Sequence, residues 1–352
     1  MKKRVTIQDI ADALGISRNT VSKAINNSSG LADSTRERIL QKAVELGYKQ
    51  FSYLETLNKI AGVEPEPEMP VGFVGEIALF TTVFLSQSHF SAMVLDRLQR
   101  DMGELGYTIN THRVTRSNLK EKTLPVTFRP DQTSAIICLE MFDFDYDEMV
   151  CDLGYPVLFL DAPAKIGGRK LAAGELYMAN TTEIVRLVHD LVSCGKKRIG
   201  FIGDYTHCQS FYERYLAFRS AMLIEGCEVE ERFVLAKNDS YSVRELLRHL
   251  DELPDVFICA NDFVAIDAMR ILSSMGKQVP RDIWISGFDD SPESHHTSPP
   301  LTTVRIHSQI QAFAAAHLIL SRLREPTLDY RTMYTETNLV YRESTPMDQE
   351  VQ

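Results

Sequence analysis

The sequence predicts a small all-α domain joined to an α/β core of two doubly wound parallel-sheet subdomains. Three observations predict this organisation. Amphipathic helical patterns fill the first 50 residues, apolar strands alternate with amphipathic helices from Val71 onward, and an acidic, proline-rich stretch at residues 61–70 separates the two regions. At 352 residues and 44% hydrophobic content, the chain exceeds one ordinary domain and can bury sizeable cores.

Two short helices that meet at a tight turn dominate the N-terminal region. An apolar stripe begins after Thr6, a candidate cap, and Gly15 permits the turn. The second helix begins after Ser17 and carries polar side chains on its outward face, near its N-terminus, which is the pattern of a helix-turn-helix that reads DNA. A plain helical hairpin with a solvated polar face is the alternative. The candidate DNA contacts here are Thr6, Ser17, Arg18, Asn19, Thr20, Ser22, Lys23 and Asn26.

A capping box at residues 34–37 opens a third helical pattern in this region, which Gly47 closes.

The charge distribution supports DNA binding by the N-terminal region. Residues 1–50 hold nine Lys and Arg against five Asp and Glu, a net charge of +4, whereas the remainder holds 29 against 43, a net charge of −14. A basic head on an acidic body places the phosphate-binding surface at the N-terminus, where Lys2, Lys3 and Arg4 would help to neutralise phosphate.

Residues 5–49, VTIQDIADALGISRNTVSKAINNSSGLADSTRERILQKAVELGYK, closely resemble the N-terminal domain of the LacI/GalR family of bacterial transcription regulators, without a gap. The resemblance implies that residues 51–60 form a hinge helix that orders on DNA. It also implies that Leu57 wedges into the minor groove, against the alternative of ordinary helix packing. This stretch departs from the family's usual Y-x-P-N-x-x-A, because Gln50, Phe51 and Leu54 are present instead.

The core resembles, more thinly, the periplasmic-binding-protein-like core of the same regulators. The similar segments are residues 194–203, 210–218, 258–262, 285–290 and 299–304, with Ala217 in place of a family glycine. The resemblance implies that Arg214, Asn261 and Asp289 contact a small-molecule effector. An arginine with an acid and an amide suits vicinal hydroxyls, because the guanidinium donates hydrogen bonds and the carboxylate accepts them.

Other residues of the core have competing interpretations. Tyr241 could stack on a sugar or pack in the core, and Ser88 and His89 follow the first strand, where family members often have an effector loop. His89 could equally be a surface or capping residue. Asp262 and Asp290 are expected to be helix N-caps rather than ligand contacts.

These patterns divide the chain into four regions. We expect a DNA-binding domain at residues 1–50, a hinge helix at 51–60, a linker at 61–70 and an effector-binding and dimerisation core at 71–345. The core's two subdomains are expected at about residues 71–162 with 305–330, and 163–304 with 331–345, since Thr332–Arg342 is predicted to be a late strand of the second subdomain.

Several classes of protein are disfavoured. The core has no G-x-S-x-G, no Walker loop and no G-x-G-x-x-G after a strand, so we expect no enzyme activity, although an α/β enzyme fused to a DNA-binding head is an alternative. The six scattered cysteines lack C-x-x-C spacing and predict buried thiols in a reducing cytosol, with no metal site and no cofactor. No signal peptide or membrane-spanning stretch is found, so a cytoplasmic, nucleoid-associated location is expected.

We therefore expect a homodimeric repressor that binds a pseudo-palindromic DNA operator, because one small helical domain covers only one half-site. A small-molecule effector, a sugar or sugar derivative, would control operator affinity. A nucleobase or a protein co-regulator is the alternative trigger.

Overall fold

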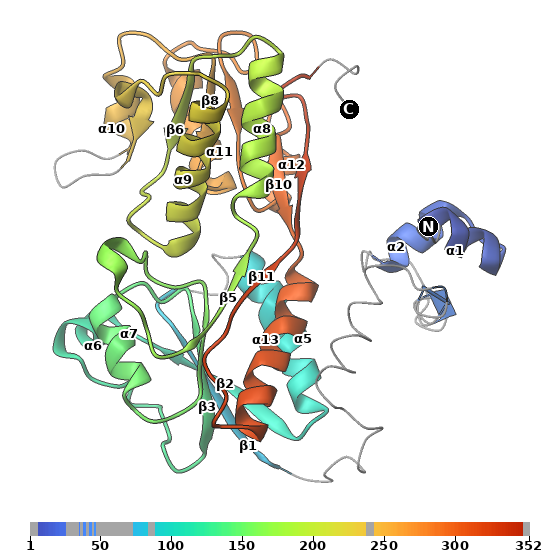
Figure 1. Ribbon diagram of the computed structural model, residues 1–352, viewed down its shortest axis with the longest axis vertical. Coiled ribbons are helices and arrows are strands. Elements are labelled where there is room, and N and C mark those ends of the chain that lie inside the picture. The colour runs from blue at the N-terminus through green and yellow to red at the C-terminus, as the bar shows by residue number, and fades with distance from the viewer. Residues whose placement is uncertain are drawn as a thin grey trace. The chain divides into compact units, whose positions relative to one another are not determined.

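In the computed structural model, the residues whose structure is described are 6–25, 35, 38, 39, 42, 43, 46, 73–83, 89–236 and 243–347. The chain divides into two units, Met1–Met69 and Pro70–Gln352, referred to below as the head and the core. Figure 1 labels most of the helices and strands of both.

The head contains the two helices that the sequence predicts, α1 (Ile7–Leu14) and α2 (Arg18–Ile25). Thr6 and Asp9 form a complete capping box at the start of α1, and Gly15 ends the helix in the left-handed region, with φ 64°. The two helices bury one small apolar core together with residues of the third helical pattern. Its buried members are Ile10, Ala11, Val21, Ala24, Ile39 and Ala43.

The first subdomain of the core is built on a six-stranded parallel sheet in the order β11-β5-β4-β3-β1-β2. Strand β1, between β3 and the edge strand β2, is buried along its whole length, and its Ile77 pairs with Ile109 of β2 and Ala135 of β3. Such continuous apolar strands are expected where helices cover both faces of a sheet. The elements are β1 (Gly75–Thr81), α5 (His89–Gly103), β2 (Tyr107–Arg113), α6 (Arg116–Glu121), β3 (Thr133–Leu139), α7 (Phe144–Cys151), β4 (Val157–Leu160), the 3-10 turn Ile166–Gly168, β5 (Gly174–Met178), α13 (Ser308–Arg324) and β11 (Thr332–Thr335).

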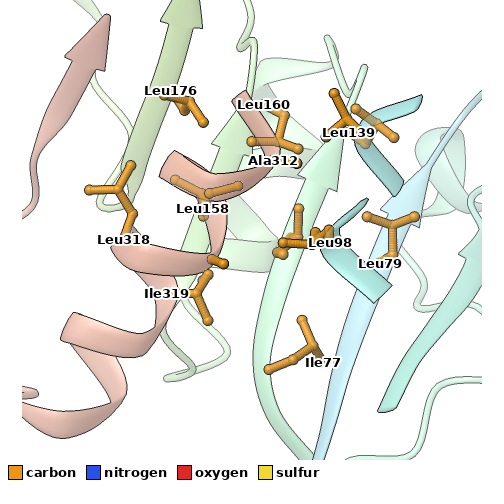
Figure 2. Close-up of a cluster of buried hydrophobic side chains, with 14 of the residues drawn as sticks. Ile77, Leu79, Leu98, Leu139, Leu158, Leu160, Leu176, Ala312, Leu318 and Ile319 are labelled. Atoms are coloured by element: carbon orange, nitrogen blue, oxygen red, sulfur yellow. The ribbon is translucent and has the colours of Figure 1, made fainter. Parts of the chain in front are cut away.

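Two hydrophobic clusters hold these layers together. Helices α5 and α13 pack on one face of the sheet, where Leu98 and Ala312 meet the strand leucines and isoleucines shown in Figure 2. Helix α7 covers the other face, where Tyr146 and Val150 pack against Phe80 and Phe159. Burial of this apolar surface is the main stabilising contribution to the subdomain.

The second subdomain is built on a four-stranded parallel sheet in the order β7-β6-β8-β9, with helices α8 and α9 on one face and α10 and α11 on the other. Two antiparallel strands, β10 and β12, lie beside it. The elements are α8 (Thr182–Ser193), β6 (Ile199–Ile202), α9 (Gln209–Ile224), the 3-10 turn Glu231–Phe233, β7 (Val234–Leu235), α10 (Val243–Arg248), β8 (Val256–Cys259), α11 (Asp262–Ser274), β9 (Trp284–Ser286), α12 (Pro292–His295), β10 (Thr303–Ile306) and β12 (Thr337–Val340). The predicted fold class, an all-α head and two doubly wound parallel sheets, is therefore confirmed.

The chain passes between the subdomains three times, at residues 179–181, at His307 and at Glu336, which we call the crossing segments. The first and third lie side by side, because Ala179 donates a backbone hydrogen bond of 2.8 Å to Thr335 and accepts one of 2.9 Å from the Thr337 hydroxyl. In Figure 1 these segments connect the upper and lower parts of the core.

The structure differs from the sequence-based subdomain limits at two strands. Strand β5 pairs with β4, and β11 pairs with β5, so residues 174–178 and 332–335 belong to the first sheet and not to the second subdomain. The predicted single strand at residues 332–342 is two strands, and only β12 lies in the second subdomain. The cause is tertiary pairing. Glu336 separates β11 from β12, and β11 pairs with β5 while β12 pairs with β10.

All six cysteines are free thiols, and Cys138, Cys151, Cys208 and Cys259 are buried. Among the described residues, no group of three or more His, Cys, Asp or Glu side chains is arranged to hold a metal ion. None of the helices in the described ranges is long and apolar enough to cross a membrane.

Candidate DNA-reading head and effector site

The outward face of α2 is polar and accessible. Arg18, Asn19 and Lys23 are exposed, whereas Val21 and Ala24, on the opposite side, are buried. Arginine and asparagine can each make paired hydrogen bonds to base edges in the major groove. The helix therefore presents the chemistry of a recognition helix on the face that the sequence predicts.

Three of the other candidate residues have a local structural role in the head. The Thr6 hydroxyl accepts a hydrogen bond of 3.3 Å from the backbone nitrogen of Asp9, and Ser17 accepts one of 3.0 Å from that of Thr20. The Ser17 and Thr20 hydroxyls are 2.8 Å apart. Ser22 is half-buried. Asn26 and Leu57 lie outside the described residues, as do Lys2, Lys3 and Arg4.

The candidate effector site lies where the start of α9 meets the carboxyl ends of strands in the first subdomain. Asp161 directly follows β4, and its carboxylate accepts a hydrogen bond of 3.2 Å from the backbone nitrogen of Ser210 in the first turn of α9. The ring of Phe142, after β3, packs edge-on against His207 at a centroid distance of 4.6 Å. Strand ends of this kind are the usual ligand-binding edge of open α/β sheets.

Arg214 is the central side chain of this site and is only 2% exposed. Its Nε donates to Asn180 Oδ1 at 3.0 Å, and Nη1 donates to the backbone oxygen of Ala260 at 2.6 Å. The guanidinium lies 3.5 Å from the ring centroid of Phe288, which fixes its plane. No hydrogen-bond partner for Nη2 is found among the described residues, so this nitrogen can donate to a ligand.

The structure brings two other candidate residues close to Arg214. Asp289 Oδ1 lies 3.8 Å from Arg214 Nη1, beyond hydrogen-bonding distance, and the Asp289 side chain is 25% exposed. Its backbone has φ 116°, a region that residues other than glycine rarely adopt. Asn261 follows Ala260 directly, and its Oδ1 caps α11 by accepting from Val264 at 2.9 Å. The Asn261 carbonyl oxygen is therefore already used, and its amide NH₂ group is the part that can face a ligand.

Burial raises the pKa of Asp289 to about 8; Arg214 opposes this shift, and the carboxylates of Asp262, Glu140 and Asp161 add to it. Burial also raises the pKa of Asp161 to about 6, against the hydrogen bonds that it accepts. The site thus contains carboxyl groups that take up or release a proton near neutral pH, together with one guanidinium. It can donate and accept hydrogen bonds at once, which suits neutral polar ligands.

The expected capping roles of Asp262 and Asp290 are wrong. Asn261 is the N-cap of α11, while the fully buried Asp262 accepts hydrogen bonds from the Ser291 backbone at 2.7 Å and the Thr303 hydroxyl at 2.6 Å. A side-chain carbon at Gly287 would lie 2.2 Å from the Asp262 carboxylate, so this glycine allows the close approach.

Asp290 is an ion-pair centre rather than a cap. It pairs with Arg305 at 2.6 Å, with His295 at 3.1 Å and with Arg342. The hydrogen bonds and charges of Arg342 and Arg305 hold the pKa of the Asp290 carboxyl below its usual value despite its burial. Asp262 and Asp290 therefore fix the loop that carries Asp289.

The remaining candidates are not located. Ser88 and Tyr241 lie outside the described residues; His89 begins α5, but its side chain is not described. Conversely, the sequence-based prediction missed Asn180, Asp161 and Phe288. Asp161 could have been found as an acid directly after an apolar strand, but Asn180 has no such local signal, because its side-chain partners lie 30 to 34 residues away.

A helix-turn-helix head on a core of two parallel-sheet subdomains defines a class of DNA-binding regulator. Comparison with known proteins is consistent with this class. Residues 6–50 match the model for bacterial regulatory proteins of the lacI family, and residues 188–345 match the model for a periplasmic binding protein-like domain. The chain belongs to the LacI family of bacterial transcription regulators.

Two relatives are similar along nearly the whole chain. The HTH-type transcriptional regulator CelR of Thermobifida fusca is 26% identical, covering 97% of this chain and 99% of the relative. The HTH-type transcriptional repressor PurR of Haemophilus influenzae is 24% identical, covering 90% and 91%.

Solved structures show the same fold. A CelR–cellobiose complex has a TM-score of 0.67 at 23% identity, covering 97% of this chain and 100% of that one. The lac repressor dimer bound to operator and the anti-inducer ONPF has a TM-score of 0.60 at 20% identity, covering 97% and 99%.

Proposed function

We propose that this regulator is a repressor whose affinity for operator DNA is controlled by a neutral polyhydroxylated effector, a sugar or sugar derivative. The observation that carries the proposal is the pair formed by Arg214 and Asp289. They lie 3.8 Å apart without a direct hydrogen bond, and Arg214 Nη2 has no partner among the described residues. Adjacent hydroxyls of a sugar could accept from the guanidinium and donate to the carboxylate.

A sugar is also supported by the similar CelR structure, which is a complex with cellobiose. Acting on chromosomal operators would place the protein in the cytoplasm. The alternative triggers, a nucleobase or a protein co-regulator, enter as outcomes of the test. Thermal unfolding should be followed with cellobiose, with monosaccharides, with purine bases and without additive. A ligand that binds only the folded state raises the melting temperature.

The proposal requires a sugar to raise the melting temperature of wild type and not that of Arg214→Lys. Lysine keeps the charge but lacks the planar donor fork. It is preferable to alanine, which would leave the buried acceptors Asn180 Oδ1 and Ala260 O unpaired and so destabilise the fold. A shift with purine bases alone would replace the sugar by a nucleobase, and no shift with any compound would favour a protein co-regulator.

On the DNA side, we propose that Arg18, Asn19 and Lys23 face base edges in the major groove. Thr6, Ser17, Thr20, Ser22 and Asn26 would lie at or near the phosphate backbone, and Leu57 would wedge into the minor groove at the centre of a pseudo-palindromic site. The exposed polar face of α2 supports the first assignment.

We also propose that a second copy of the chain packs on α11 and α12. A groove of about 640 Å³ between these helices is lined by Ile266, Met269, Arg270, Ser273, Pro292, Glu293, His296, Thr297 and Ser298. Phe263, one turn before Ile266 on α11, is 46% exposed. Arg270 and Glu293 have opposite charges on this one surface, so two copies related by a two-fold axis could pair each with the other.

A further inference from the structure

The Glu213 carboxylate joins α9 to the segments that connect the two subdomains. Its Oε2 accepts a hydrogen bond of 2.8 Å from Asn180 Nδ2, in the first crossing segment. Its Oε1 accepts one of 2.8 Å from the Tyr334 hydroxyl, in β11, and one of 3.0 Å from Gln209 Nε2. One carboxylate therefore has partners in the crossing segment, in the first subdomain and in its own helix.

Asn180 connects this carboxylate to the proposed effector arginine. The residue is 1% exposed, and its amide makes hydrogen bonds through both ends. Nδ2 donates to Glu213 and, at 3.3 Å, to the Ser210 hydroxyl, while Oδ1 accepts from Arg214 Nε at 3.0 Å. Because Glu213 needs a donor and Arg214 an acceptor, the amide has one orientation in which both are satisfied.

The same region holds the crossing segments against each other. Ala179 is hydrogen bonded to Thr335 and Thr337 on either side of Glu336. Gln209 adds a second link to the first subdomain, because its Oε1 accepts from the backbone nitrogen of Lys165 at 2.9 Å. Any rotation of the second subdomain about these segments must move α9 relative to Asn180 and Tyr334.

We propose that Glu213 is a positioning residue, which locks the start of α9 to the crossing segments through Asn180 and Tyr334 and so sets the relative arrangement of the two subdomains. The proposal rests on the proposed function in one respect, that Arg214 binds the effector. A ligand that draws Arg214 away from Asn180 Oδ1 then weakens this lock. Such a ligand binds the locked and the unlocked arrangement of the two subdomains with different affinities.

Glu213→Gln and Tyr334→Phe test the lock in the ligand-free, full-length protein. Glutamine keeps the size of the side chain but replaces one of the two accepting oxygens by an NH₂ group. In one orientation this group faces the Asn180 donor, and in the other it faces the donors of Gln209 and Tyr334. Phenylalanine removes one donor. Glu231→Gln is the matched control for the first variant, since Glu231 pairs with Arg219 of the same helix but is 67% exposed. Tyr330→Phe is the control for the second, since Tyr330 and Tyr334 are similarly exposed.

Hydrogen–deuterium exchange measured by mass spectrometry is the readout. We expect amides in residues 179–182 and 335–338 to exchange about fivefold faster in Glu213→Gln, the loss of one net hydrogen bond, and more modestly faster in Tyr334→Phe. Both controls should match wild type, and peptides from β6 and β8 should be unchanged in all four variants. Faster exchange throughout the second subdomain would make Glu213 a general stability residue and would overturn the proposal, as would equal exchange in Glu213→Gln and Glu231→Gln.

A second readout separates a regulatory role from local fraying. The affinity of ligand-free protein for DNA selected in vitro from a random pool should change at least about threefold in Glu213→Gln and stay unchanged in Glu231→Gln. Unchanged affinity together with faster exchange would overturn the control of subdomain arrangement. Failure of the proposed function would appear separately, as a wild type that no sugar stabilises, and would leave the exchange comparison intact.

Discussion

Asp147 allows a prediction whose size follows from the structure. The residue lies in α7, is 0% exposed, and neither of its carboxylate oxygens has a hydrogen-bond partner among the described residues. Burial raises its pKa from 3.8 to about 8, and the nearby Asp143 adds to the shift. The other titratable groups facing it, Cys138, Tyr146 and Cys151, also have raised pKa values and stay protonated at neutral pH.

The sign of the effect follows from the protons bound. Between about pH 4 and pH 8 the folded protein keeps a proton on Asp147 that the unfolded chain releases, so stability falls as the pH rises through this range. For one such group, each rise of one pH unit lowers the free energy of unfolding by about 1.4 kcal/mol. An asparagine at this position has no proton to lose. From about pH 5 to about pH 7 the Asp147→Asn variant should therefore gain about 2.7 kcal/mol in free energy of unfolding relative to wild type.

Urea unfolding followed by circular dichroism at the two pH values measures this difference. Asp145→Asn is the control, because Asp145 lies on the same helix but is exposed and pairs with Arg169 at 2.7 Å. That pair lowers the pKa of Asp145, so the control should show no gain between the same two pH values. Parallel pH profiles for wild type and Asp147→Asn would refute the assignment of an uncompensated buried carboxyl.

Three further predictions concern DNA, assembly and ligand. Arg18→Ala should cost about 1–3 kcal/mol at a selected operator and little on random DNA in fluorescence anisotropy; equal losses on both would reduce Arg18 to a phosphate contact. Arg270→Glu should shift the sedimentation profile toward monomer, and adding Glu293→Lys should restore the dimer; a dimer that is indifferent to both changes would move the interface elsewhere. Because the pKa of Asp289 is about 8, the ionised fraction of its carboxyl group rises about tenfold from pH 7 to pH 9. The affinity for an identified sugar should rise by up to the same factor, since the carboxylate is the stronger acceptor, and Asp289→Asn should remove this dependence; a slope that persists in the variant would assign the titration to another group.

The sequence was sufficient for the architecture because helix and strand periodicities are local. The helix cap at Thr6 and the turn at Gly15 lie where the patterns predict them. The assignment of strands to sheets was not local. Strand β5 follows a polar loop and is only five residues long, and β11 and β12 are separated by a single residue although they join different sheets.

The candidate site was predictable in its conspicuous residues and not in their supports. Arg214 and Asp289 were identified through the family resemblance, and the structure brings them within 3.8 Å. Asp262 was misassigned because its hydrogen bonds reach Ser291 and Thr303, 29 and 41 residues away, where helix-start patterns carry no information. Asn180 was missed for the same reason.

We propose that ligand occupancy at Arg214 controls operator binding. The direct measurement is the affinity of wild type and Arg214→Lys for one selected operator, with and without the sugar that raises the wild-type melting temperature. We expect the sugar to change the wild-type dissociation constant by about 5- to 150-fold and to leave that of Arg214→Lys unchanged, while both proteins bind the operator alike without sugar. An equal response of both proteins at the same sugar concentration would contradict it.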